Sequence, residues 1–150
     1  MDLGNLDTVA VSEKGATLYL THPDTGEPLH CDDGTPMTIE VLGMDSKTYR
    51  NKVDSLQNKR WSSGRMRMTA QRNEVDAVEI LASCTITWNI QLRGNKVEPS
   101  PDNYRQVYKN PGLRWLRDQV DNFMGDRANF LPPPPVREGE KMTQTGTETG

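Results

Sequence analysis

The sequence predicts an α+β fold: a small N-terminal antiparallel β-sheet of two to three strands packed on a bundle of about four α-helices, with a disordered C-terminal tail. Before Gly43 apolar residues alternate with polar ones, which is the period of a strand. From Lys47 to Leu131 they recur every three or four residues, which is the period of a helix. After Pro135 almost no apolar residue follows, so that segment cannot bury enough surface to offset the entropy of ordering it.

Length and composition favour one domain over residues 1–131, followed by a Pro-rich and polar tail at 132–150. Of the 150 residues 33% are hydrophobic, and the mean hydropathy is -0.78. This content lies below the roughly 45–50% that is usual for globular chains. We therefore expect a small core and large polar faces that partners help to cover.

Two segments have the alternation of a strand with one buried face. Their apolar residues are Ala16, Leu18 and Leu20 in the first segment and Met37, Ile39 and Val41 in the second. Between them, residues 27–30 are a candidate for a short third strand, next to the turn at Asp32-Asp33-Gly34. Because two strands alone are marginal in water, this sheet must rest on the helices that follow.

The first predicted helix begins after the turn and cap residues Asp45 and Ser46. Tyr49, Val53 and Leu56 follow at helical spacing, and we expect this helix to end near Trp61.

A second predicted helix runs from about Thr69 to Trp88. Its apolar face is formed by Val75, Val78, Ala82 and Ile86, with Ile80, Leu81 and Trp88 beside them. The end of this helix is ambiguous, because the β-branched run from Thr85 to Ile90 suits a strand equally well. We assign it to the helix.

Two more helices are predicted by their caps. Ser100 precedes Pro101, and proline is well tolerated at the first helical position, where no amide donor is needed. Asn110 and Pro111 repeat the arrangement for a last helix, which we extend to Leu131 before four prolines. The apolar residues of these two helices are Tyr104, Val107, Tyr108, Leu113, Trp115, Leu116, Val120, Phe123 and Met124.

Candidate chemistry is confined to one cluster, and its spacing does not fit a site. His22, His30 and Cys31 lack the two paired ligand sets of a closed zinc site. Asp32 and Asp33 lack the later glutamate of a calcium loop, so a solvated turn is the better interpretation. No glycine-rich phosphate loop is present. We assign no catalytic, cofactor-binding or metal-binding residue and expect a protein that is not an enzyme.

Charge is distributed unevenly. Between Lys47 and Arg72 eight basic residues stand against Asp54 alone, although the whole chain has a net charge of -3. A pI near 5.4 argues against a dedicated nucleic-acid binder. The arginines of this segment suit an acidic protein surface, because planar guanidinium groups pair with carboxylates. Basic and acidic helix surfaces in one chain also permit a homo-oligomer.

Six residues form the hypothesis for a partner-binding surface. Tryptophan and arginine are enriched among binding hot spots, which draws attention to the last helix and to the basic segment. The residues are Arg60, Arg65, Arg67, Arg114, Trp115 and Phe130.

The chain begins without the basic start and apolar core of a secretory signal, and no apolar run approaches the roughly 18 residues that cross a bilayer. We expect a cytosolic protein in which Cys31 and Cys84 are free thiols.

A family resemblance covers about residues 14 to 131. Its elements are the turn Pro23 to Glu27, the run Ile39 to Ser46 leading into Tyr49-Arg50, then Leu81-Ala82, Trp88, Gly94, Ser100 to Tyr104, Pro111 to Leu116, Val120 and Arg127 to Phe130. In this order they resemble the tail assembly chaperones of long-tailed (siphovirus-type) bacteriophages.

The resemblance implies a non-enzymatic chaperone that binds the tape measure protein, helps recruit tail tube subunits and leaves before the tail is complete. It would act in the host cell cytoplasm and be absent from the mature virion. Many members are also made as a longer product of ribosomal frameshifting, and Glu140-Lys141 can be encoded by an A-rich slip site. Two alternatives stay open: a small structural tail or head-completion protein, and a nucleic-acid-binding regulator that uses residues 47–72.

Overall fold

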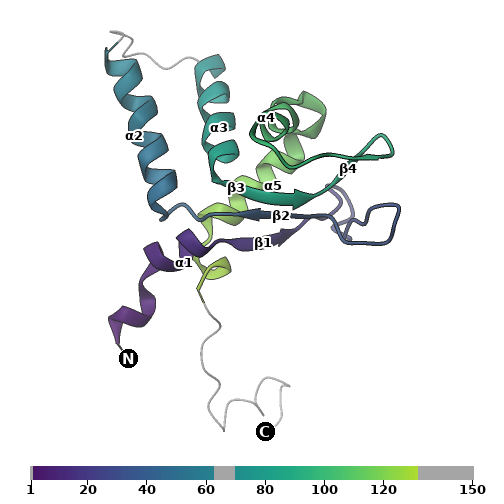
Figure 1. Cartoon of the computed structure of the whole chain (residues 1–150), viewed down its shortest axis with the longest axis horizontal. Coiled ribbons are helices and arrows are strands. Elements are labelled where there is room, and N and C mark those ends of the chain that lie inside the picture. Colours follow the sequence, from purple (N-terminus) through teal and green to yellow (C-terminus); the bar gives the residue numbers. More distant parts are fainter. Residues whose placement is uncertain (1, 63–69, 132–150) are drawn as a thin grey trace, which may run out of the picture.

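The computed structural model describes the backbone of residues 2–62 and 70–131, and the side chains of these residues except 60–62 and 70–73. The fold is α+β, as predicted, with five α-helices and one three-stranded antiparallel sheet in the described part. Figure 1 shows α4 and α5 beside the sheet, while α2 and α3 form a pair that extends from one end of it. The predicted disordered tail at 132–150 lies outside the described residues.

The sheet has the strand order β1 (Ala16–Tyr19), β2 (Thr38–Val41) and β3 (Thr85–Asn89). Antiparallel pairing aligns Leu18 with Ile39 and Ile39 with Trp88, so these three side chains lie on one face. Ile39 and Val41 in the central strand are fully buried. The predicted alternation in the first two strands is therefore confirmed.

The third strand comes from a segment that we assigned to a helix. Helix α3 (Ala70–Cys84) ends where the β-branched run begins, so its predicted extension to Trp88 is wrong. Pairing with β2 favours the extended backbone that β-branched residues prefer. The hydroxyl of Thr85 donates to the carbonyl of Leu81 at 2.8 Å and lies 2.7 Å from the Tyr108 hydroxyl.

The candidate third strand at residues 27–30 is likewise wrong. This segment makes only two isolated bridges, between Thr21 and Pro28 and between His30 and Pro36. Its place in the sheet is taken by β3, which pairs with the other side of β2.

Helix α2 (Lys47–Ser62) matches its prediction, and Tyr49, Val53 and Leu56 are half-buried. Its first turn is capped from a distant segment: the Glu13 carboxylate accepts hydrogen bonds from the amides of Lys47 and Thr48. A carboxylate at a helix N-terminus satisfies amides that have no partner in the helix.

Glu13 belongs to helix α1 (Thr8–Lys14), which the sequence analysis did not predict. The 3-10 turn η1 (Leu3–Leu6) precedes it. Both are shorter than the window in which a periodic pattern becomes visible.

The cap predicted at Ser100 is confirmed, whereas Asn110 caps a 3-10 turn that precedes the last helix instead of the helix itself. The amide of Asn103 donates to the Ser100 hydroxyl at 3.2 Å at the start of α4 (Pro101–Lys109). The amide of Gly112 donates to the Asn110 side chain at 2.9 Å, which begins the 3-10 turn η2 (Pro111–Leu113) ahead of α5 (Arg114–Gly125). Helix α5 does not continue to Leu131, because Asp126 caps a separate 3-10 turn, η3 (Arg127–Asn129).

A short hairpin joins β3 to α4. Its strands are β4 (Gln91–Leu92) and β5 (Asn95–Lys96), and its turn residues Arg93 and Gly94 both have positive φ values, 52° and 84°. Positive φ at both central residues is what a two-residue type I′ turn requires.

The core lies between the sheet and helices α3, α4 and α5. The Trp88 ring packs edge-on against two tyrosine rings. Its centroid lies 4.6 Å from that of Tyr104 and 6.2 Å from that of Tyr108. Two residues of the predicted apolar face are not in this core, because Val75 and Ile86 are about half exposed. Within residues 2–62 and 70–131 no helix is both long and apolar enough to span a membrane.

Candidate protein-binding surfaces

An apolar cleft of about 150 Å³ lies at the end of the sheet where β1 finishes. Six of its lining side chains are half-buried and five of these are apolar, so the cleft presents apolar surface at its mouth. We call it the Trp115 cleft. Its lining residues are Leu20, Leu29, Met37, Ile90, Gln91, Leu92, Val107, Leu113, Trp115 and Leu116.

One wall of the Trp115 cleft is the long loop between β1 and β2. Backbone hydrogen bonds fold this loop on itself: Leu20 donates to Met37 at 3.0 Å, Leu29 donates to Leu20 at 3.0 Å, and Met37 donates to Leu29 at 2.9 Å. These bonds bring three apolar residues that are separated in the sequence to one place. This wall of the cleft is therefore held by hydrogen bonds between loop residues, and it contains no helix or strand.

The side chain of Gln119 fixes this loop to α5. It accepts a hydrogen bond from the Thr21 amide at 3.2 Å and donates one to the Thr21 carbonyl at 2.8 Å. The Gln119 side chain thus satisfies both backbone groups of Thr21, as a neighbouring strand would do. The loop wall and the helix wall of the cleft are held at a set separation.

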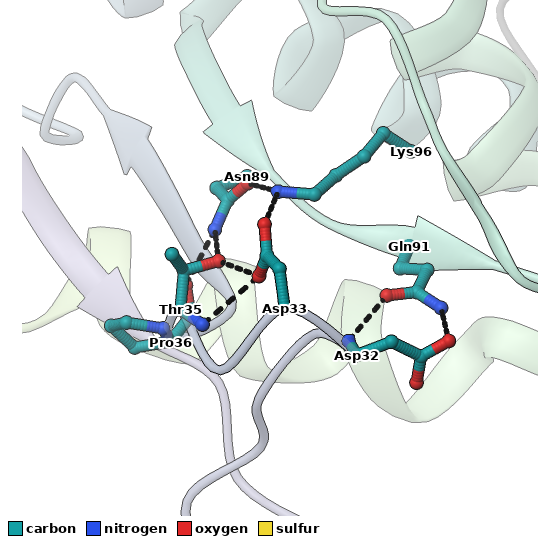
Figure 2. A network of polar contacts seen from close by, with 7 residues as sticks. All are labelled: Asp32, Asp33, Thr35, Pro36, Asn89, Gln91 and Lys96. Atoms are coloured by element: carbon teal, nitrogen blue, oxygen red, sulfur yellow. Dashed lines mark hydrogen bonds and ion pairs between the residues drawn. The ribbon is translucent and has the colours of Figure 1, made fainter.

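The other end of the loop is fixed to the β4–β5 hairpin through the acids that the sequence analysis considered as metal ligands. Figure 2 shows Gln91 facing Asp32: its amide nitrogen donates to the carboxylate at 2.5 Å, and its oxygen accepts from the Asp32 amide at 2.7 Å. Asp33 accepts from the hydroxyl and the amide of Thr35, at 2.6 and 3.0 Å. The Thr35 hydrogen bonds, with Lys96, lower the pKa of Asp33 to about 2.

Lys96 and Asn89 complete this network. The Lys96 ammonium lies 3.2 Å from the Asp33 carboxylate and donates to the Asn89 side chain at 2.6 Å. Asn89 in turn donates to Thr35 and to the carbonyl of Pro36. The acids of the Asp32-Asp33 turn therefore attach the loop to the hairpin, in agreement with the interpretation of a turn.

The histidine and cysteine residues of that cluster also have structural surroundings. The Nδ1 atom of His22 accepts hydrogen bonds from the amides of Asp24 and Thr25, at 3.0 and 3.1 Å. Cys31 and Cys84 are buried free thiols, as predicted. Burial raises the pKa of the Cys84 thiol to about 12, so it stays protonated and is a poor nucleophile. Among the residues that the structure describes, no group of three or more His, Cys, Asp or Glu could hold a metal ion.

The residues proposed to contact a partner lie in different surroundings. Trp115 is half-buried in the cleft that bears its name. Arg114 is exposed and pairs with Glu74 on α3 at 2.9 Å, and the buried Arg117 binds the same carboxylate at 2.6 Å. Phe130 is buried against Phe123, with ring centroids 5.6 Å apart, so it offers little surface to a partner. The side chains of Arg60, Arg65 and Arg67 lie outside the described part.

A second and wider hollow, of about 490 Å³, lies between α2 and the end of α5. Its lining is mixed, with the carboxylates of Asp121 and Asp126, the Asn122 amide and the side chains of Met44 and Tyr49. Burial raises the pKa of Tyr49 above its usual value. The carboxylates together with the C-terminal end of a helix favour a positive charge here.

An exposed apolar surface near the start of the chain was not among the predicted binding residues. Leu3, Leu6 and Val9 are 79%, 44% and 39% exposed, and we call residues 2–14, which carry them, the leucine arm. Asp2 caps η1 by accepting from the Gly4 amide at 2.9 Å, and Asp7 caps α1 by accepting from the Val9 amide at 3.0 Å. The signal in the sequence was the three-residue spacing of Leu3, Leu6 and Val9, with a capping acid before Leu3 and another after Leu6.

No protein-family model matches the chain, and neither a curated protein nor a solved structure matches it.

Proposed function

We propose that this protein is a tail assembly chaperone of a long-tailed bacteriophage, which binds the tape measure protein and helps recruit tail tube subunits. The family resemblance of residues 14 to 131 names the class. The observation that supports it best is the Trp115 cleft, an apolar hollow with a half-buried tryptophan in its lining. Such a surface takes apolar side chains from another protein.

The client contact is an apolar side chain of the tape measure protein seated in the Trp115 cleft. Burying one leucine-sized side chain contributes about 1.5–3 kcal/mol, which alone gives binding weaker than millimolar. Useful affinity then requires many copies along one client. A long client with repeated apolar positions provides this by raising the effective concentration of every further contact.

Co-expression with the tape measure protein of the same phage tests this directly. With the wild-type chain the tape measure protein should stay soluble and co-purify. Trp115→Ser should reduce the amount of client recovered several-fold, because the cleft loses its largest apolar side chain. Val75→Ser is the matched control, since Val75 is a half-exposed apolar residue outside the cleft. Equal recovery with Trp115→Ser and wild type would overturn the cleft as the client site.

The basic segment supplies a second contact in this proposal. Arg65→Glu combined with Arg67→Glu should weaken client recovery if acidic client surface meets these residues. Recovery that does not change would leave the Trp115 cleft as the client site and remove the arginines from the proposal.

The chaperone role also has a consequence for the finished particle. A chaperone leaves before the tail is complete, so mass spectrometry of purified virions should find this chain absent or in trace amounts. A stoichiometric amount would favour the structural tail or head-completion protein instead. A longer frameshift product is part of the proposal, and sequencing the gene around Glu140-Lys141 would remove it if no slip site precedes an overlapping frame.

A further inference from the structure

The leucine arm and the Trp115 cleft lie at opposite ends of strand β1. Gly15 joins the arm to the start of this strand, and Leu20, just beyond its end, lines the cleft. Figure 1 shows α1 and η1 extending from the start of β1 away from the rest of the sheet, while the β4 hairpin lies at the other end. The arm therefore cannot reach the cleft of its own chain.

The arm is an ordered structure with no core of its own. Its far end is fixed to the body by Ser12, whose carbonyl accepts from the Gly43 amide at 3.0 Å, and by Glu13, which caps α2. Leu3 and Leu6 have no such attachment and remain exposed. In a 3-10 turn, residues three apart lie on the same side, so these two leucines form one apolar ridge.

The size of the cleft fits a side chain of this ridge. An apolar cavity of about 150 Å³ is of the order that holds a benzene-sized group. The branched four-carbon side chain of leucine is no larger. Leu29, Leu92, Leu113 and Trp115, all half-buried, provide the apolar surface that such a side chain would contact.

The arm carries exposed acids, and exposed cations lie beside the cleft, where the acid Asp32 is also present and is bound to Gln91. The arm carries the exposed carboxylates of Asp2 and Asp7, whose contacts are with backbone amides of the arm. Arg93 directly follows the cleft residue Leu92, and Lys109 lies two residues after Val107; both are exposed. No ion pair joins any of these four side chains to another described residue. The acids of an arm can therefore pair with the cations beside a cleft.

We propose that the leucine arm of one copy docks in the Trp115 cleft of a second copy. The contact joins two different surfaces, so it builds a dimer in which each arm fills the other copy's cleft, a larger closed ring, or an open chain of copies. The self-association stands without the client. Its regulatory consequence rests on the proposed function: an arm in the cleft covers the client site, and a tape measure segment must displace it.

Light scattering of the purified full chain, from micromolar to near-millimolar concentration, tests the docking. The wild-type mass should rise with concentration above that of a monomer: a stop at a dimer indicates reciprocal exchange of arms, and growth beyond a dimer indicates a larger ring or an open chain. Leu3→Glu with Leu6→Glu should lower the association constant by about tenfold or more, because it removes the apolar ridge and adds charge. Leu92→Glu should have the same effect from the cleft side. Val75→Glu, the control at an exposed apolar position elsewhere, should associate like wild type.

Mixing the variants separates a contact between an arm and a cleft from a contact between two arms or between two clefts. The arm variant keeps an intact cleft and the Leu92 variant keeps an intact arm, so an equimolar mixture should form one contact and stop at a dimer. Thermal unfolding by circular dichroism confirms that each variant is folded, and Leu92→Ser is a milder substitute if Leu92→Glu unfolds. A wild-type chain that is monomeric throughout, or a mixture without a dimer, would overturn the proposal.

The client assay distinguishes this proposal from the chaperone function. The folded arm variant should recover at least as much tape measure protein as wild type, because its cleft is no longer covered. Loss of client with the arm variant would contradict the competition between arm and client. If the wild-type chain stays monomeric at every concentration and still recovers the client, self-docking is overturned and the chaperone function stays in place.

Discussion

The body of the domain and the leucine arm place the same residue type in opposite environments. Leu20 and Leu116 in the body are 1% and 4% exposed, whereas Leu3 and Leu6 in the arm are 79% and 44% exposed. Apolar burial stabilises the body, as in most globular proteins. The arm is shaped by the capping carboxylates of Asp2 and Asp7. Its leucines contribute little to its fold, which is why we assign them to binding.

The largest expected effect on stability comes from a substitution in the core of the body. Ile39 lies in the central strand and is fully buried, so Ile39→Ala should lower the free energy of unfolding by about 2–5 kcal/mol through lost burial and an unfilled cavity. Denaturant unfolding of the purified chain measures this. A loss below about 1 kcal/mol would contradict the view that the sheet face against the helices stabilises the domain.

A smaller effect is expected where the body depends on a polar group. The Tyr108 hydroxyl lies 2.7 Å from the Thr85 hydroxyl, at the point where α3 changes to β3. Tyr108→Phe removes one buried hydrogen bond and should cost about 1 kcal/mol. Thr85 still donates to Leu81 in this variant, so the strand should persist. An unfolding free energy equal to that of wild type would show that the contact is not needed.

The pH dependence of stability sharpens the comparison at the junction of the body with η3. Asp45 accepts hydrogen bonds from Arg127 at 2.5 and 3.0 Å, and these bonds lower the pKa of its carboxyl below the usual value of about 4. A lowered pKa gives stability that is present above pH 4 and is lost as the pH falls through the folded-state value. Asp45→Asn should therefore unfold with a flatter dependence on pH in acid, and an unchanged acid profile would contradict this assignment.

The smallest effect is expected in the arm. Leu3→Ala should change the free energy of unfolding by less than about 0.5 kcal/mol, since the side chain is mostly exposed. The measurement is the denaturant unfolding used for Ile39→Ala, at a concentration low enough for the chain to be monomeric. A loss of 2 kcal/mol or more would place Leu3 in the core and end the distinction between the two regions.

Sequence patterns predicted the parts of the body in which periodicity or caps are local. Each of these signals lies within one segment: the apolar alternation around Leu18, the one around Ile39, and the capping residues Ser100 and Asn110. The end of α3 was not, because Thr85 to Trp88 suits both helix and strand, and the choice was made by pairing with β2.

The candidate binding surfaces were only partly predictable, for a similar reason. Trp115 stood out as an aromatic residue on the flank of an amphipathic helix. The cleft around it depends on contacts between residues far apart in sequence, such as Gln119 with Thr21. Phe130 was predicted as a contact residue, but η3 turns it against Phe123. The arm was not predicted because η1 and α1 are shorter than the window used to recognise a helix, so the three-residue spacing of its apolar residues and its two capping acids were overlooked.

A cross-linking experiment between labelled copies tests the central claim most directly, namely that the arm is a binding element for the cleft of a second copy. A photoreactive residue replaces Leu6 in a chain labelled with nitrogen-15, and this chain is mixed with unlabelled wild type and irradiated. We expect mass spectrometry to find peptides in which labelled position 6 is joined to unlabelled residues around Leu29, Leu92 or Leu113. Cross-links confined to one chain, or joined to surfaces away from the cleft, would contradict the account.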